Sequence, residues 1–79
     1  MKLSEAVKLR IDELKEEHKI TEYKLSDLVG APRSTYHYFA TGHYDKVVLN
    51  LIKDTCDVLD ISLVEFFNSP LFAKENLTD

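Results

Sequence analysis

The chain has 79 residues, of which 44% are hydrophobic, and its formal net charge is −4. This hydrophobic content is too high for a disordered chain, and at this length we expect one small domain without a separate ligand-sensing domain. The acidic balance argues against a nonspecific nucleic-acid binder, because such proteins usually carry a basic excess over the whole domain.

The single cysteine, Cys56, cannot form an internal disulfide and falls in the apolar pattern of a helix. A buried, reduced thiol is typical of cytoplasmic proteins, so we expect a cytoplasmic protein. The first residues lack the apolar core of a signal peptide, and no apolar run approaches the length of a membrane span. We therefore expect no membrane partner.

The first predicted helix covers residues 4–18. Val7, Ile11 and Leu14 recur there at helical spacing and form an apolar face. Charged residues cover the other side, and several of them are spaced for i,i+3 or i,i+4 ion pairs. The charge run at 12–19 is therefore interpreted as a solvated face.

A second helix is predicted to begin after Thr21, whose side chain is a good N-cap, and to end at Gly30. Glycine permits the left-handed conformation that stops a helix. Pro32 is then predicted to start a third helix, where its missing N–H costs little. The buried stripe of the second helix is predicted to consist of Leu25, Leu28 and Val29.

The third predicted helix, residues 33–41, has two different faces. Tyr36, Phe39 and Ala40 are expected to be buried. No Asp or Glu occurs between Asp27 and Asp45, so the helix falls in the longest acid-free stretch of the chain. A surface that meets phosphates must exclude carboxylates locally. The polar face consists of Arg33, Ser34, His37, Tyr38 and Thr41.

Residues 48–59 are predicted to form a fourth helix, and a short fifth helix follows it. Ser62 and Glu65 have the spacing of a capping box, which marks the start of the fifth helix. Pro70 ends it. The buried face of the fourth helix is predicted to carry Val48, Ile52, Cys56 and Leu59.

These elements predict a compact all-α fold of five helices. The domain is expected to cover residues 1–69 and to be followed by a short tail, residues 70–79, that frays unless Leu71 and Phe72 pack on a neighbour. The sequence contains no strand alternation, no internal repeat and no linker.

The two helices around Gly30 resemble the helix-turn-helix of phage repressor and Cro-type domains, often called the Xre family. The resemblance depends on the joint order and spacing of several positions and covers about residues 5–69. It implies a lambda-repressor-like five-helix fold with the motif at helices two and three. The matching positions are Thr21, Leu25, Gly30, Ala31, Tyr36 and Gly42 in the motif, and Ile52, Leu59, Ile61, Ser62, Leu63 and Phe66 downstream.

This resemblance implies sequence-specific binding of double-stranded DNA by a small transcriptional regulator, expected to be a repressor. The third helix would enter the major groove, and the Arg33 fork would bind guanine O6 and N7. Residues at the start of the second helix and beyond the third would hold the DNA backbone. The expected contact residues are Thr21, Tyr23, Lys24, Arg33, Ser34, Thr35, His37, Tyr38, Lys46 and Asn50.

Three positions in the motif depart from the family pattern. Glu22 stands where many relatives have Gln, and its carboxylate would repel a phosphate unless it turns away. Pro32 stands where a capping Ser is common, and Tyr36 replaces an aliphatic residue.

A second class of function stays open at this point. A chain with this fold could act as a protein-interaction module, such as a partner or antagonist of another regulator, with little DNA binding. Glu22, the net acidity and the aromatic surface at His37 and Tyr38 favour this alternative.

The sequence favours neither an enzyme nor a metalloprotein. No nucleophile elbow, phosphate loop or metal-ligand motif accompanies its Ser, His and Asp residues. His37 and His43 are spaced i,i+6, which fits no standard ligand pair. We therefore predict no enzyme activity, no metal, no cofactor and no small-molecule ligand.

A homodimer is expected, because relatives read two half-sites as dimers and because a core of this size provides little stability. The fifth helix or the tail would form the interface. The apolar residues expected there are Phe66, Phe67, Leu71 and Phe72.

Overall fold

The computed structural model describes residues 1–43 and 46–79, and within these ranges it contains helices and no strand. The predicted all-α class with five helices is confirmed there, and no helix of these ranges has the length and apolar character of a membrane span. The elements are α1 (Leu3–Glu17), α2 (Glu22–Val29), α3 (Arg33–Ala40), α4 (Leu49–Leu59), α5 (Leu63–Phe67) and two 3₁₀ turns, η1 (Pro70–Phe72) and η2 (Lys74–Asn76).

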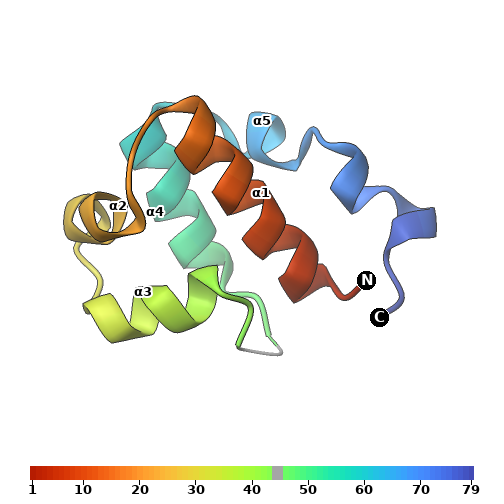
Figure 1. Ribbon diagram of the computed structural model, residues 1–79. Coiled ribbons are helices and arrows are strands. Elements are labelled where there is room, and N and C mark those ends of the chain that lie inside the picture. The colour runs from red at the N-terminus through yellow and green to blue at the C-terminus, as the bar shows by residue number, and fades with distance from the viewer. Residues whose placement is uncertain (44–45) are drawn as a thin grey trace.

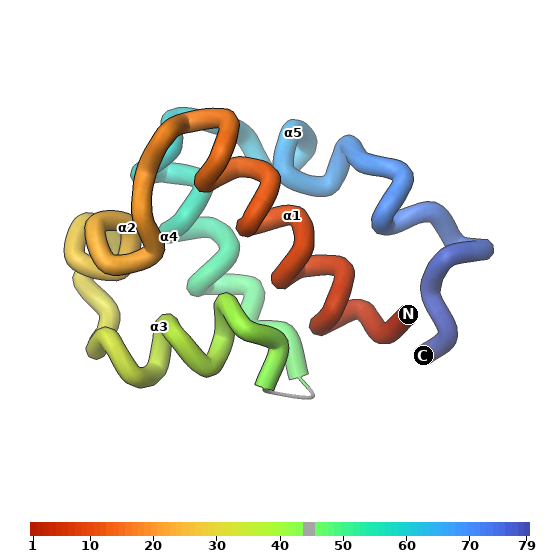
Figure 2. The backbone as a smooth tube through the Cα atoms, viewed as in Figure 1, coloured from red at the N-terminus to blue at the C-terminus, as the bar shows by residue number. Residues whose placement is uncertain are grey.

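Helices α1 and α4 lie across the middle of the molecule, with α2 and α3 on one side and α5 with the 3₁₀ turns on the other (Figure 1). The tube view shows that the red and blue ends of the chain lie side by side (Figure 2). Helix α1 contacts α3 and η1, whereas α4 contacts α2 and α5. The helices of the candidate site, α2 and α3, therefore rest on α1 and α4.

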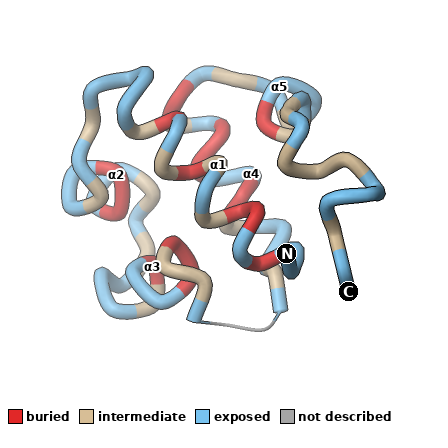
Figure 3. Tube along the Cα trace, turned by 45° about the vertical axis from the view of Figure 1, so that its right-hand side comes forward, coloured by how far each residue is buried: buried red, intermediate tan, exposed pale blue. Residues whose placement is uncertain are grey.

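Each helix contains at least one buried residue (Figure 3), and each contributes at least one large side chain that is fully buried. Burial of a large apolar side chain stabilises a fold by about 1.5–3 kcal/mol. Because these side chains belong to one core cluster, the position of each helix depends on the others. From α1 to α5 they are Ile11, Leu25, Tyr36, Ile52 and Phe66.

The ends of α2 and α5 follow the predicted local chemistry. The Thr21 side chain accepts a hydrogen bond from the Lys24 backbone N–H (3.1 Å) and caps α2, whereas Gly30 ends it with a left-handed φ of 79°. Ser62 and Glu65 form the predicted capping box. These signals involve only near neighbours in the sequence, so they could be predicted without knowledge of the packing.

Three predictions about individual residues are wrong. Leu28 is 50% exposed, because the packed face of α2 is centred between Leu25 and Ser26, about a third of a turn away. Val48 is 42% exposed, because α4 begins one residue later and the Val48 backbone is extended. Pro32 is the N-cap of α3 and not its first helical residue, since its ψ of 136° is extended.

The C-terminal segment packs against the domain, so the prediction that it frays is wrong. The Phe72 ring centroid lies 4.9 Å from that of Phe67 and 6.1 Å from that of Phe66. The Thr78 backbone N–H donates to the Met1 carbonyl (2.9 Å). Rings that were expected at a dimer interface are therefore packed within the chain, and the homodimer stays a prediction.

Arg10 of α1 closes the C-terminal end of α5. Its Nε and Nη2 groups donate to the backbone carbonyls of Phe66 (2.7 Å) and Glu65 (2.8 Å). The last carbonyls of a helix have no partner within that helix, so the guanidinium supplies one. Helix α5, with five residues, therefore receives two of its C-terminal hydrogen bonds from another helix.

Candidate nucleic-acid interface

The predicted division of α3 into a buried and an exposed face is confirmed. Tyr36 is fully buried and Phe39 is 4% exposed, so both belong to the core. Thr35, another expected contact, is half-buried. The exposed face carries Arg33, Ser34, His37 and Tyr38.

A groove of about 580 Å³ lies between α2 and the exposed face of α3. Five of the ten expected contact residues line it, although they come from two helices. Ser26 was not predicted to take part; it is 4% exposed, and its hydroxyl donates to the Tyr23 carbonyl (2.9 Å). The lining residues are Glu22, Tyr23, Ser26, Arg33, Ser34, His37 and Tyr38.

Tyr23 and Arg33 meet in this groove. The Arg33 Cζ atom lies 3.9 Å from the centroid of the Tyr23 ring, which is the geometry of a cation–π contact. Within the part of the chain that the structure describes, no group accepts a hydrogen bond from the Arg33 guanidinium or forms an ion pair with it. Arg10, the second arginine, instead donates to α5. Arg33 is therefore held in place while its donors stay available.

Glu22, the carboxylate that was expected to oppose a phosphate, turns toward its own protein. Its Oε2 atom lies 2.8 Å from His37 Nδ1, and its Oε1 atom lies 3.5 Å from Lys15 Nζ. Only 28% of the Glu22 side chain is exposed. A neighbouring ammonium offsets the field of a carboxylate, so Glu22 repels an approaching phosphate less than an unpaired carboxylate would.

Lys15 is a participant that sequence reasoning missed. Residues 15, 22 and 37 have no local spacing that relates them, and only the packing of α1, α2 and α3 brings them together. No signal in the sequence alone could have identified this arrangement.

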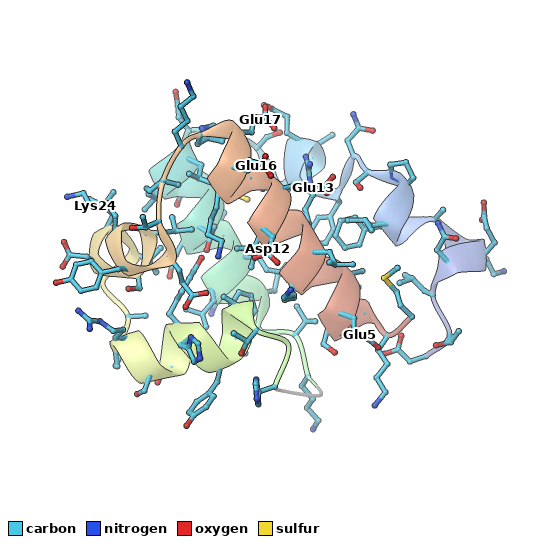
Figure 4. The ribbon with its side chains drawn as sticks, viewed as in Figure 1. Glu5, Asp12, Glu13, Glu16, Glu17 and Lys24 are labelled. Atoms are coloured by element: carbon cyan, nitrogen blue, oxygen red, sulfur yellow. The ribbon has the colours of Figure 1, made fainter. Side chains whose placement is uncertain are left out.

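Five of the 14 acidic residues of the chain lie on another helix, α1. Figure 4 shows a series of acidic side chains along α1, with Lys24 on α2 at the side of the molecule that carries the groove. Helix α3 carries no carboxylate. The labelled acidic residues of α1 are Glu5, Asp12, Glu13, Glu16 and Glu17.

The other expected contact residues form two groups. Thr21 and Lys24 are exposed at the first turn of α2, beside the groove. Lys46 and Asn50 are exposed beyond the C-terminal end of α3. Lys46 lines a small hollow together with Phe39, which places it near the last turn of α3.

The chain matches no protein-family model, no curated protein and no solved structure. Its likeness to the Xre family stays a prediction from the sequence.

The histidines near the groove contact protein side chains. Across the described ranges, no three His, Cys, Asp or Glu side chains gather as ligands for an ion. His43 Nδ1 lies 2.7 Å from Thr41 Oγ1, and that hydroxyl donates to the His37 carbonyl (2.7 Å). These contacts close the C-terminal end of α3.

Proposed function

We propose that this chain binds double-stranded DNA sequence-specifically through a lambda-repressor-like helix-turn-helix at α2 and α3, and acts in the cytoplasm as a small transcriptional repressor. The observation that carries the proposal is the exposed, acid-free face of α3 beside the first turn of α2. The major groove of B-DNA admits an α-helix, and side chains on its exposed face can then meet base edges.

The first turn of α2 suits a phosphate. The first N–H groups of a helix lack partners within it, and the helix dipole favours an anion there. The Thr21 side chain satisfies the Lys24 N–H, whereas no described group accepts from the N–H groups of Glu22 and Tyr23. The Lys24 ammonium adds positive charge to the same turn.

Selection from a random pool of duplexes tests the proposal directly. We expect one sequence to be enriched, and a palindrome if the proposed homodimer binds two half-sites. Sedimentation equilibrium of the protein with and without the selected duplex then measures the stoichiometry. A pool that shows no enrichment contradicts sequence-specific binding.

Arg33→Ala is expected to weaken binding to the selected duplex by about 1–3 kcal/mol and to relax the preference at one base position. The reason is loss of a bidentate contact with guanine. Because the Arg33 side chain is exposed, the melting temperature should hardly change. Fluorescence anisotropy on the selected duplex and on a scrambled duplex of equal composition measures both effects.

Arg33→Lys is the matched control for this variant, since it keeps the charge and loses the planar fork. It should bind the scrambled duplex as the wild type does and still lose preference for the selected one. If Arg33→Ala weakens binding to both duplexes equally, Arg33 contacts a phosphate and not a base.

Glu22→Gln is expected to tighten binding to the selected and the scrambled duplex alike, by about 0.5–1 kcal/mol. The substitution removes a negative charge from the groove, while Lys15 keeps its ion pair with Asp12. Anisotropy titrations at several salt concentrations should show the gain shrinking as salt rises. An unchanged affinity at low salt would mean that the Glu22 carboxylate does not act on the phosphates, because it turns toward Lys15 and His37.

The groove favours a second candidate function, a protein-interaction module. Tyr23 and Tyr38 are 60% and 46% exposed at its walls, and exposed tyrosines are typical of protein interfaces. A salt titration against random duplex separates the two candidates. A DNA-binding protein loses affinity steeply as salt rises, whereas an interaction module binds weakly at every salt concentration.

A further inference from the structure

We infer that Tyr23 is a positioning residue, whose ring holds the Arg33 guanidinium so that its fork meets a guanine edge. This inference rests on the proposed function. The sequence suggested a different role for Tyr23, a direct contact with the DNA backbone at the start of α2. The structure instead places its ring against Arg33, with 3.9 Å between the ring centroid and Cζ.

The contact with the ring does not compete with base recognition. A cation–π contact uses the flat face of a guanidinium, whereas the N–H donors lie at its edge, in the plane of the group. Within the described ranges, those donors are not taken by any protein acceptor. Asp27 lines a small hollow beside Arg33 but forms no ion pair with it. The planar group is therefore oriented, and its edge is open toward solvent.

Orientation matters because an arginine side chain loses rotamer freedom when it forms a bidentate contact. A ring that restricts the side chain in the free protein reduces that loss. Tyr23 lies in the first turn of α2 and Arg33 in the first turn of α3, and the turn at Gly30 joins the two helices. The folded motif therefore brings the ring and the guanidinium together before any duplex binds.

Two substitutions at Tyr23 distinguish the role of its ring from the role of its hydroxyl. Tyr23→Phe keeps the ring and should bind the selected duplex as the wild type does. Tyr23→Leu keeps apolar bulk without a π face, and it should bind that duplex about two- to fivefold more weakly, as expected for an exposed cation–π contact. Binding of Tyr23→Leu to the scrambled duplex should not change. Thermal melts check that both variants are folded.

Two further arms test whether Tyr23 acts through Arg33. In a double-mutant cycle, Tyr23→Leu should add no loss when Arg33 is already alanine. Replacing the contacted guanine of the selected duplex by 7-deazaguanine removes N7, and it should also remove most of the difference between the wild type and Tyr23→Leu.

A readout on the free protein keeps the inference separate from DNA binding. The Arg33 Nε–H resonance should carry a ring-current shift that persists in Tyr23→Phe and disappears in Tyr23→Leu.

If both variants bind both duplexes more weakly, the hydroxyl contacts a phosphate, and the inference fails while the proposed function stands. Tighter binding by Tyr23→Leu would mean that the ring withholds Arg33 from DNA, which also overturns the inference. If the wild type enriches no duplex, the proposed function and the inference fall together.

Discussion

Phe39→Ala is expected to destabilise the fold by about 3–5 kcal/mol, because the Phe39 ring is 4% exposed and belongs to the main core cluster. Its centroid lies 6.0 Å from that of Tyr36. A domain of this size has only about 3–5 kcal/mol of net stability, so the free energy of unfolding of the variant should be near zero and a large fraction of its molecules unfolded at 25 °C. Far-UV circular dichroism and urea unfolding measure this loss.

The neighbouring residue provides a matched control. Tyr38 is 46% exposed on the opposite face of α3, and Tyr38→Ala should change the free energy of unfolding by less than about 1 kcal/mol. Phe39→Leu, a milder change expected to leave the chain folded, allows the loss to be measured if the alanine variant has no folded baseline. A folded Phe39→Ala protein with wild-type stability would contradict the buried face assigned to α3.

The stability of the wild type is expected to fall by about 2 kcal/mol as pH rises from about 10 to about 12, through ionisation of Tyr36. Burial raises the pKa of Tyr36 from its ordinary value of 10.0 to about 12, and the nearby Glu22 carboxylate acts in the same direction. Between these pH values the unfolded chain loses the phenolic proton and the folded chain keeps it. The contribution of the Tyr36 phenol to stability is therefore fully present below about pH 10 and is lost as pH rises toward 12.

Tyr36→Phe should be less stable than the wild type at the low end of this pH range and more stable at the high end. The Thr55 hydroxyl donates to the Leu51 carbonyl (2.8 Å), so the Tyr36 hydroxyl must be the donor in its 3.1 Å contact with Thr55. Loss of this bond should cost the variant about 1 kcal/mol at pH 8. At pH 11.5 the variant should be the more stable protein, because it has no phenol to ionise.

Urea unfolding of the wild type and Tyr36→Phe at intervals from pH 8 to 11.5 checks this crossover. Exposed tyrosines and lysines titrate in both proteins and cancel in the difference. A difference that stays constant with pH would mean that the Tyr36 pKa is the same in the folded and unfolded states.

Local chemistry explains which parts of the fold were predictable. The faces of α3 follow from helical spacing at Tyr36 and Phe39, and the end of α2 follows from the backbone freedom of Gly30. Leu28 is different, because its apolar character allowed burial, but the direction in which α2 packs left it half exposed. A pattern reports which residues share a face, whereas the packing partners decide which face is covered.

The candidate site divides in the same way. Exposure of Arg33 and His37 could be predicted, because it depends on α3 alone. Their partners, Tyr23 and Glu22, lie on α2, and each contact depends on how the two helices are placed. The sequence therefore predicted which side chains of α3 are exposed, but not which residues of α2 they contact.

The bond between Arg10 and α5 has a consequence for the order of folding. A helix of five residues cannot stand alone, because forming its first turn costs more free energy than its few hydrogen bonds return. The acceptor on Phe66 lies 56 residues along the chain from Arg10, so closing this contact requires most of the chain to be already arranged. Contacts of such sequence separation form slowly. Helix α5 should therefore be added late in folding, after α1 and α4 have formed the surface that receives it.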